Sequence, residues 1–373
     1  MNIMARPPAA ETILDRVTAL IPCMQRRAIA ADNDADFPAE DIAALRETGV
    51  LALPLPIEQD VWNDDIGETI DRLADVLMRI GIGNLSVGRL IEAHINARHL
   101  IARYGTPSQK ASAADDLDAG HLFALWVTDP PGPGLHMVRA RDGIRLDGGK
   151  MFCSAAGFAT RAVVTAVDET GQSRMLTILL GNGERVRSLE APLQGMRAAV
   201  TGAVDFTGCT TDQDACLGEP GDYLREPDFS SGAWRGSAVA AGGLRNLLDL
   251  AIAQLRMAGR LDNPHHLQRL GNAMIAWETS RLWVKQAARI AEDPNANPAS
   301  AVAYVGLARI AVETACLDAM QLVQRSLGLS AFRRGNPVEL VSRDLGTYLR
   351  QPAPDAVLTE AAGYFAQQPM SDR

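Results

Sequence analysis

The sequence predicts an α+β fold in which a helical domain, a β domain and a second helical domain follow one another along the chain. Three observations predict it. Apolar residues recur at helical spacing from about residue 9 to 118, short β-branched runs broken by Gly, Asp and Asn fill 120–217, and helical spacing returns from about 229 to 366. Such an order is typical of a small barrel or sandwich between two helical bundles. We therefore expect domains at 1–119, 120–218 and 219–373.

The N-terminal segment is expected to form helices in four places. Apolar residues recur at helical spacing over 13–21, and Phe37-Pro-Ala-Glu40 opens a second helix that Gly49 ends. Two buried helices are expected over 73–80 and 85–104, separated by a Gly-Ile-Gly-Asn break. In the middle segment, 162–167 and 175–180 are expected strands. In the C-terminal segment, 294–298 is the clearest interruption between helices.

Two features of the N-terminal helices could suggest ligand sites. Gly81-Ile-Gly83 looks like part of a dinucleotide-binding loop, but it follows a helical stretch instead of a strand, so we predict a helix break. His94 and His99 lie five positions apart, whereas ligands on one helix face are three or four apart. We predict that both are core or interface histidines.

Two short runs in the middle segment carry the strongest functional signal. The run 125–130 contains Thr128 at the end of a strand, and the run 146–154 contains Phe152 and Ser154. A flat heteroaromatic cofactor needs apolar or aromatic contact for its faces and a few polar groups for its edge, and these residues supply both. The alternative is a plain β-hairpin with Asp147-Gly148 as its turn.

These runs resemble the flavin-binding middle domain of the acyl-CoA dehydrogenase superfamily. That family carries Leu-Thr-Glu-Pro in the first strand and Leu-Asn-Gly-x-Lys-x-Trp-Ile-Thr in the second. Here the matching residues are Thr128-Asp-Pro130 and Leu146-Asp-Gly-Gly-Lys-Met-Phe-Cys-Ser154. Weaker matches follow the family's order along nearly the whole chain: Phe37-Pro-x-Glu40, Gly195-Met-Arg197, Val204-Asp-Phe206, Leu327-Gly328, Pro337-Val-Glu339 and Arg343-Asp344. The resemblance implies an N-terminal helical bundle, a middle β domain and a C-terminal four-helix bundle.

The resemblance also implies a cofactor and the residues that hold it. The cofactor would be FAD, with Thr128, Phe152 and Ser154 against its ring. A neighbouring subunit supplies Arg-x-x-Phe-Gly to the pyrophosphate in this family, and Arg256-Met-Ala-Gly259 keeps its Arg and Gly. A solvated cation at a helix end is the alternative for Arg256. Gly328 would approach the adenosine half. A homodimer or homotetramer is therefore expected.

The resemblance leaves the catalytic base open. Removal of a proton α to a thioester needs a carboxylate, but the family's usual Glu position falls on Pro352, and the other known position, in 231–235, has no acid. A shift in alignment makes Asp355 or Glu360 the base. We predict Asp355, because it follows Pro352-Ala-Pro354 and could project into the site from a rigid turn; Asp228 is a further candidate. Arg235 is the expected substrate-binding residue; it could bind a nucleotide phosphate or only neutralise a helix-entry loop.

Three functions follow from the resemblance. The first is an FAD-dependent oxidoreductase that desaturates the Cα–Cβ bond of an acyl-CoA or another acyl thioester, with an electron acceptor as a partner. The second is a flavin-dependent monooxygenase, because Arg343–Pro352 also resembles that branch, where Tyr348 and Gln351 would replace two His residues. The third is a non-catalytic homologue.

Composition limits the other classes of function. The chain has 373 residues, with 45 acidic and 36 basic side chains and a formal charge of −9, which argues against nucleic-acid or basic membrane-surface binding. It has no run of 18 apolar residues, and residues 1–11 do not resemble a secretory signal. The five scattered cysteines are expected to be reduced thiols in a cytoplasmic protein, without a metal site.

Overall fold

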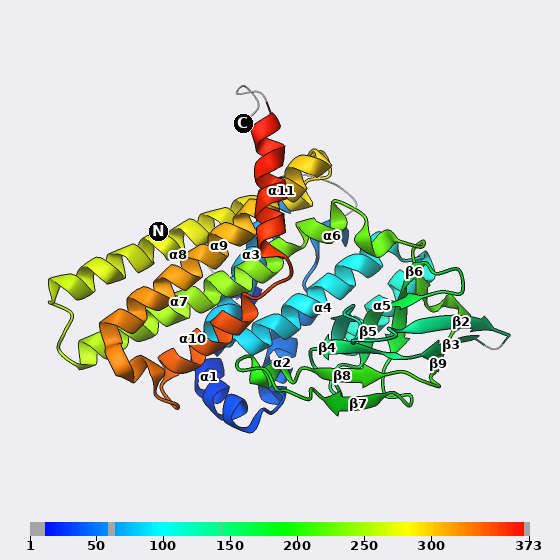
Figure 1. Ribbon diagram of the computed structural model, residues 1–373, viewed down its shortest axis with the longest axis horizontal. Coiled ribbons are helices and arrows are strands. Elements are labelled where there is room, and N and C mark those ends of the chain that lie inside the picture. Colours follow the sequence, from blue (N-terminus) through cyan, green and yellow to red (C-terminus); the bar gives the residue numbers. More distant parts are fainter. Residues whose placement is uncertain (1–11, 59–63, 142, 369–373) are drawn as a thin grey trace, which may run out of the picture.

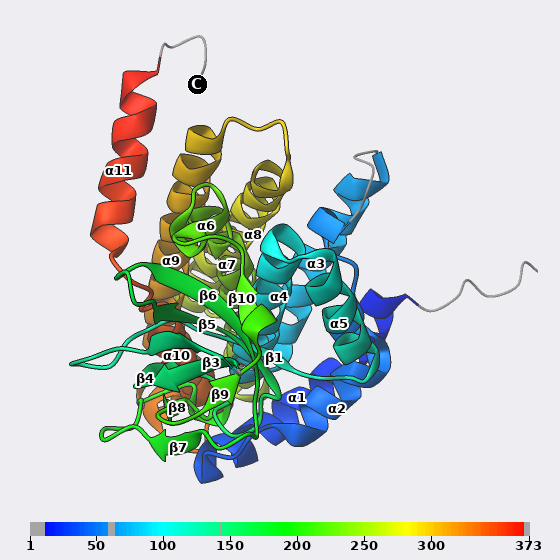
Figure 2. The same ribbon diagram turned by 90° about the vertical axis from the view of Figure 1, so that its right-hand side faces the viewer.

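The computed structural model describes residues 12–58, 64–141 and 143–368. Residues 1–11, which we predicted not to be a secretory signal, lie outside the described residues. The predicted order of helices, strands and helices is confirmed. The strands lie together on one side of the molecule, the C-terminal helices lie on the other, and α4 runs between them (Figure 1). The last helix, α11, projects from the molecule in both views (Figures 1 and 2).

The N-terminal helices begin and end at the local signals of the sequence. Thr12 and Asp15 form a capping box at the start of the first helix, and Gly49 ends the second in the left-handed conformation, with a φ of 87°. Asn84 separates the third and fourth helices and caps the fourth. The elements are α1 (Ile13–Asp34), α2 (Ala39–Thr48), η1 (Val50–Ala52), η2 (Pro56–Glu58), α3 (Asp64–Gly83), α4 (Leu85–Tyr104) and α5 (Pro107–Asp118).

The described strands form a seven-stranded sheet, in the order β10-β6-β5-β2-β3-β9 with β1 beside β5, and a three-stranded sheet in the order β4-β8-β7. The elements are β1 (Phe123–Trp126), β2 (His136–Ala140), β3 (Gly143–Asp147), β4 (Gly149–Cys153), β5 (Arg161–Val167), β6 (Ser173–Leu179), β7 (Arg185–Ser188), η3 (Arg197–Ala199), β8 (Gly202–Asp205), β9 (Thr210–Thr211), η4 (Gln213–Ala215) and β10 (Cys216–Leu217). Because β3 and β4 belong to different sheets, the hairpin alternative for Asp147-Gly148 is wrong. The chain crosses between the sheets at Gly148, whose φ is 92°.

The C-terminal helices pack into a bundle around α7 and α9. Their bounds are η5 (Asp222–Leu224), α6 (Asp228–Ser231), α7 (Ala233–Met257), α8 (Pro264–Glu292), α9 (Pro298–Leu327), η6 (Gly328–Phe332), α10 (Pro337–Tyr348) and α11 (Pro354–Gln367). Helix α7 also crosses α3, so the bundle and the N-terminal helices share one core. By length and composition, 298–332 could cross a membrane, but this stretch packs against α7, α8 and α11.

His94 joins an N-terminal turn to the first strand. Its Nε2 lies 2.8 Å from the carbonyl oxygen of Leu51, and the backbone N–H of Phe123 donates to its Nδ1 at 3.0 Å. Since Nδ1 accepts, the ring proton lies on Nε2. Burial lowers the pKa of His94 to about 3, and the nearby charge of Arg98 acts in the same direction. His94 is therefore a neutral core histidine.

Candidate active site

The two runs that the sequence singled out lie side by side. The backbone N–H of Met151 in β4 donates to the carbonyl oxygen of Thr128, just beyond β1, at 2.8 Å. Lys150, one of only three lysines in the chain, is buried beneath them. Its Nζ lies 3.3 Å from the carbonyl oxygen of Val127, 2.5 Å from Oδ1 of Asp129 and 2.9 Å from Oγ1 of Thr165. The lysine thus holds the end of one run against the other.

Phe152 points out of this junction. The pairing of β4 with β8 is irregular between Lys150 and Cys153, and Phe152 within this bulge has a φ of 55°. A bulge turns a side chain out of its regular alternation, and a non-glycine residue at positive φ is strained, as is common at functional sites. The ring is 48% exposed, although it lies in the middle of a packed domain. Phe152 is therefore available to contact a ligand.

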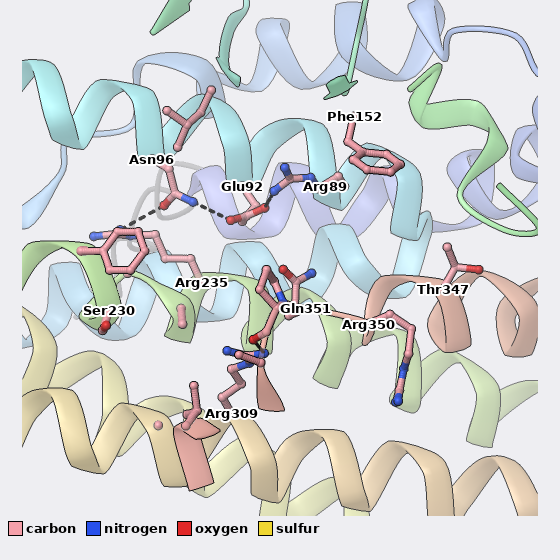
Figure 3. Close-up of a pocket in the computed structure, with 18 of the residues that line it drawn as sticks. Arg89, Glu92, Asn96, Phe152, Ser230, Arg235, Arg309, Thr347, Arg350 and Gln351 are labelled. Atoms are coloured by element: carbon pink, nitrogen blue, oxygen red, sulfur yellow. Dashed lines mark hydrogen bonds and ion pairs between the residues drawn. The ribbon is translucent and has the colours of Figure 1, made fainter. Parts of the chain in front are cut away.

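Phe152 and Thr128 line a cavity of about 1930 Å³. Its walls come from α4, the ends of β1 and β4, α6 and α7 on one side, and from α9, α10 and α11 on the other. An ordinary ligand pocket measures roughly 300–1,000 Å³, so this cavity has room for a large cofactor and a second molecule. Polar side chains from several of these helices project into it (Figure 3).

One wall of the cavity carries a connected set of polar groups. Arg89, Glu92 and Asn96 project from α4, and both Arg89 and Asn96 donate to the carboxylate of Glu92 (Figure 3). From α7, Arg235 donates to Oδ1 of Asn96 at 3.0 Å and meets Nδ1 of His99 at 3.0 Å. We refer to Arg89, Glu92, Asn96 and His99 as the α4 polar stripe.

The sequence contained a signal for this stripe that our predictions missed. Positions 89, 92, 96 and 99 follow helical spacing, and they are polar within a helix whose other residues are mostly apolar and buried. Charged residues are rarely buried unless they are paired or functional. A polar stripe on a buried helix could therefore have been predicted as part of a site.

Arg235, the predicted substrate-binding residue, lines the cavity but is already paired. Its Nη2 lies 2.5 Å from Oε1 of Glu292, and the side chains are only 5% and 4% exposed. Burial alone would raise the pKa of Glu292, but the charge of Arg235 lowers it overall. Because Glu292 neutralises Arg235, the structure favours a supporting role for this arginine over direct binding of a thioester or phosphate.

The structure does not support Asp355 as the base. Asp355 lies in the first turn of α11, is exposed and is not among the residues that line the cavity. Glu360 lies further along the same helix and does line it. Val357, in the first turn of α11, lines the cavity. Asp355 lies two positions before it, on another side of the helix, and therefore points away from the cavity.

Most of the carboxylates that line the cavity have partners. Among the described residues, Glu360 is the exception, since no side chain or backbone group pairs with it. The others accept hydrogen bonds or ion pairs as follows: Glu92 from Arg89 and Asn96, Glu226 from Ser230, Asp228 from Arg103 and Tyr104, and Glu339 from Arg334 and Arg343.

The remaining predicted contacts lie outside the cavity of one chain. Ser154 is buried, and its carbonyl oxygen accepts from the indole of Trp126 at 2.9 Å. Gly328 follows α9 with a φ of 64°, and a Cβ atom there would meet no described atom within 4 Å. Arg256 is exposed in the last turn of α7. The structure thus brings Thr128, Phe152 and Arg235 to the cavity, but not these three.

Tyr348 and Gln351 both lie at the site. Gln351 lines the main cavity, and both residues line a smaller chamber of about 110 Å³ that Glu92 also reaches. The Tyr348 hydroxyl is buried and has no hydrogen-bond partner among the described residues. Burial raises the pKa of Tyr348 well above 10, and the nearby charge of Glu92 adds to the shift. The hydroxyl therefore stays protonated.

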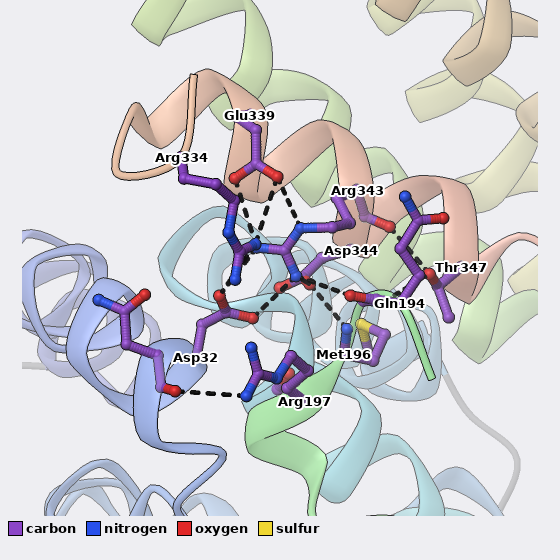
Figure 4. A network of polar contacts seen from close by, with 12 residues as sticks. Asp32, Gln194, Met196, Arg197, Arg334, Glu339, Arg343, Asp344 and Thr347 are labelled. Carbon is purple, nitrogen blue, oxygen red and sulfur yellow. Dashed lines mark hydrogen bonds and ion pairs between the residues drawn. The ribbon is translucent and has the colours of Figure 1, made fainter. Parts of the chain in front are cut away.

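A second network, part of which lines the cavity, joins three parts of the chain (Figure 4). Arg343 in α10 pairs with Asp32 of α1 and with Glu339, and it donates to the carbonyl oxygen of Gln194 at 2.9 Å. The neighbouring Asp344 accepts from the backbone N–H of Met196 at 2.7 Å. The motifs Gly195-Met-Arg197 and Arg343-Asp344 lie far apart in the sequence. In the structure they are in direct contact.

Asp344 is expected to make stability depend on pH. Burial raises its pKa from 3.8 to about 7, while the N–H of Met196 opposes the shift. A raised pKa in the folded state means that the stabilising contribution is complete below pH 3.8 and is lost as pH rises through about 7. Asp344→Asn, which keeps the acceptor for Met196, should therefore raise the midpoint of thermal unfolding at pH 8 and leave it nearly unchanged below pH 3.8. Parallel pH curves for the two proteins would contradict this assignment.

The described residues contain no cluster of three His, Cys, Asp or Glu side chains that could hold a metal ion. The five cysteines are all unpaired.

Comparisons with known proteins place this fold. No family model matches the chain. It is 24% identical over 366 residues to 3-sulfinopropanoyl-CoA desulfinase of Paraburkholderia xenovorans, covering 92% of each chain. It is 25% identical over 336 residues to the mitochondrial short-chain specific acyl-CoA dehydrogenase of Bos taurus, covering 84% of this chain and 79% of the bovine protein.

Solved structures give the same result. Butyryl-CoA dehydrogenase of Megasphaera elsdenii superimposes with a TM-score of 0.79, at 16% identity, covering 98% of this chain and 100% of that one. The chain has the fold of the acyl-CoA dehydrogenase superfamily, and the similar sequences support the resemblance seen in its motifs. The dibenzothiophene monooxygenase TdsC of Paenibacillus, in a complex with FMN and indole, superimposes with a TM-score of 0.84 at 19% identity, covering 97% of this chain and 98% of that one. The superfamily fold therefore accommodates both kinds of enzyme.

Proposed function

We propose that the chain is a flavin-dependent oxidoreductase and that it oxygenates a small substrate. The observation that carries the proposal is the pair Thr128 and Phe152, held together by Lys150 at the wall of a cavity large enough for a cofactor and a substrate. Phe152 would contact a face of the flavin ring, and Thr128 would offer its hydroxyl and backbone groups to the ring edge. The flavin would supply two-electron chemistry.

The cavity residues fit either FMN or FAD in different ways. The ring contacts at Thr128 and Phe152 are common to both. FAD would in addition need Gly328, which has open space beside it, and Arg256 from a second copy of the chain. FMN would need only the cavity of one chain. The family resemblance favours FAD, and direct titration with each flavin decides between them.

The state of the carboxylates favours oxygenation over desaturation. Loss of a proton from the α carbon of a thioester needs a carboxylate free to take it, and among the described carboxylates of the cavity wall only Glu360, which is exposed, is unpaired. Oxygenation needs no such base: one atom of O₂ enters the substrate, the other leaves as water, and a reduced flavin supplies two electrons. In this reaction the residues of the chain would bind and orient the substrate and exclude water.

The second candidate is the Cα–Cβ desaturation of an acyl thioester. Glu360 supports it, because this carboxylate lines the cavity and is unpaired among the described residues. Glu360 would accept the α proton, the hydride would pass to the flavin, and a separate electron acceptor would reoxidise it. In this reaction Glu360→Gln should abolish turnover, whereas Asp355→Asn should leave it unchanged.

The test begins with flavin binding. The purified full-length chain is titrated with FMN and with FAD, and the quenching of flavin fluorescence gives each dissociation constant. Phe152→Ala should weaken binding by about tenfold or more, since a lost aromatic contact costs about 1–2 kcal/mol. Phe158→Ala is the matched control: Phe158 is also 48% exposed and lies in the same domain, but it stacks on Phe37 outside the cavity. Equal weakening by the two variants, or no binding of either flavin, would reject the site.

The flavin-loaded protein then separates the two reactions. Bleaching of the oxidised flavin by butyryl-CoA without oxygen would favour desaturation. If butyryl-CoA has no effect, but the chemically reduced protein consumes oxygen and converts indole into a hydroxylated product, oxygenation is supported.

We further propose that the chain assembles as a homodimer or homotetramer through α8. Large apolar side chains lie exposed at helical spacing along this helix: Leu267, Met274, Ile275 and Leu282. Such a stripe on a surface helix favours packing against another chain. Light scattering of the wild type should give a multiple of the 39.9 kDa chain mass. The Ile275→Glu variant should give the mass of a single chain.

A further inference from the structure

The α4 polar stripe is costly unless it has a function. Four polar side chains occupy one face of a buried helix at the cavity wall, where a simple alkyl chain would be accommodated better by leucine or valine. Burial of charged groups away from water costs free energy even when they are paired. Most of the other residues of α4 are apolar and buried, so the packing of this helix does not depend on the stripe.

Most groups of the stripe are saturated by one another. The carboxylate of Glu92 accepts from Arg89 at one oxygen and from Asn96 at the other. The amide of Asn96 donates to Glu92 and accepts from Arg235, whose charge is balanced by Glu292. These contacts fix the positions of the side chains and leave them little capacity for a ligand.

Arg89 and His99 keep free donors. Arg89 has five N–H groups, of which one donates to Glu92, and it has no other partner among the described residues. Because Nδ1 of His99 meets the donor Nη2 of Arg235, the ring proton lies on Nε2. Burial, followed by the charge of Arg235, lowers the pKa of His99 to about 4, so the ring is neutral. A ligand in the cavity thus meets hydrogen-bond donors along this wall.

We infer that Arg89 is the substrate-binding residue and that it takes a substrate bearing an oxygen acceptor, such as a carbonyl or a carboxylate, in place of a plain hydrocarbon. Glu92 positions the guanidinium of Arg89, and Asn96, Arg235 and Glu292 in turn hold Glu92. A hydrocarbon would cover the free N–H groups of Arg89 without pairing them, which is unfavourable. This inference rests on the proposed function, because it assigns the substrate of the same cavity.

Isothermal titration calorimetry of the full chain, with and without saturating flavin, tests the inference. The ligands are toluene, acetophenone and benzoate, which share a ring and differ in their acceptor. The wild type should bind acetophenone or benzoate at least about tenfold more tightly than Arg89→Met does, since a hydrogen bond to a charged group contributes that much or more. Toluene should bind both proteins equally. A preference for benzoate identifies a carboxylate, and a preference for acetophenone identifies a carbonyl.

Two further variants make the result specific. Arg350→Met makes the same change elsewhere on the cavity wall, where Arg350 pairs with Glu313, and it should leave all three affinities unchanged. Arg89→Lys, which keeps the charge, should recover part of the affinity and excludes misfolding as the cause. Equal affinities of wild type and Arg89→Met for both acceptor ligands would overturn the inference, as would failure of the wild type to bind any of the three. Loss of flavin binding alone would refute the proposed function, since the flavin-free titrations still report on Arg89.

Discussion

Replacement of Glu292 by Leu is expected to lower the free energy of unfolding by about 3–5 kcal/mol, because it removes one partner of a buried ion pair. Glu292 is the counter-charge of Arg235, and both side chains are almost completely buried. Without it, Arg235 would remain in a low-dielectric site with no carboxylate to balance its charge. Trp234 would also lose its acceptor, Oε1 of Glu292, at 3.1 Å.

A double-mutant cycle tests this pairing. Arg235→Met alone should destabilise the protein by a similar amount, and the double variant should lose at least about 2 kcal/mol less than the sum of the two. Urea denaturation measures all three. Asp249→Asn is the control on the same helix, because the Arg245–Asp249 pair is solvent-exposed and should contribute less than about 0.5 kcal/mol. If Arg235→Met left stability unchanged but weakened ligand binding, Arg235 would return to the substrate-binding role that the sequence predicted.

Gly81→Ala is expected to destabilise the protein by about 1–3 kcal/mol through a clash of two helix backbones. A Cβ atom at Gly81 would lie 2.3 Å from the carbonyl oxygen of Val239 on α7. On the facing helix, a Cβ at Gly242 would lie 2.1 Å from the carbonyl oxygen of Met78. Both obstacles are backbone atoms, so α3 and α7 would have to move apart.

Gly67→Ala is the matched control, since Gly67 lies in the same helix and a Cβ there would meet nothing within 4 Å. Alanine is the better helix former, so this variant should be more stable than the wild type by about 0.5–1 kcal/mol. The midpoints of urea unfolding compare the two variants directly. If both alanines changed stability in the same direction, close contact of α3 with α7 would not be what requires glycine at 81.

Local signals in the sequence were sufficient to predict the order and the type of the elements. Helical periodicity and the end of α2 at Gly49 depend on neighbouring residues, and these predictions hold in the structure. The break before α4 is shorter than predicted, because α3 continues through Gly81 to Gly83 and only Asn84 interrupts the helices. The runs around Thr128 and Phe152 were also recognisable, because a resemblance between sequences preserves short motifs. The hairpin alternative failed because whether β3 pairs with β4 depends on strands distant in the sequence.

The site required the tertiary structure. The sequence favoured Asp355 over Glu360 as the base, and only the direction in which α11 presents them shows that Glu360 reaches the cavity and Asp355 does not. Arg235 and Glu292 lie 57 positions apart in the sequence, on two different helices. No local sequence pattern therefore indicates that the charge of this arginine is already neutralised. The sequence by itself predicted the superfamily, the three-part fold and three of the cavity residues, Thr128, Phe152 and Arg235. Only the folded chain decided which charges pair with one another and which remain free for a ligand, because electrostatic pairing depends on distance in space and not on separation along the chain.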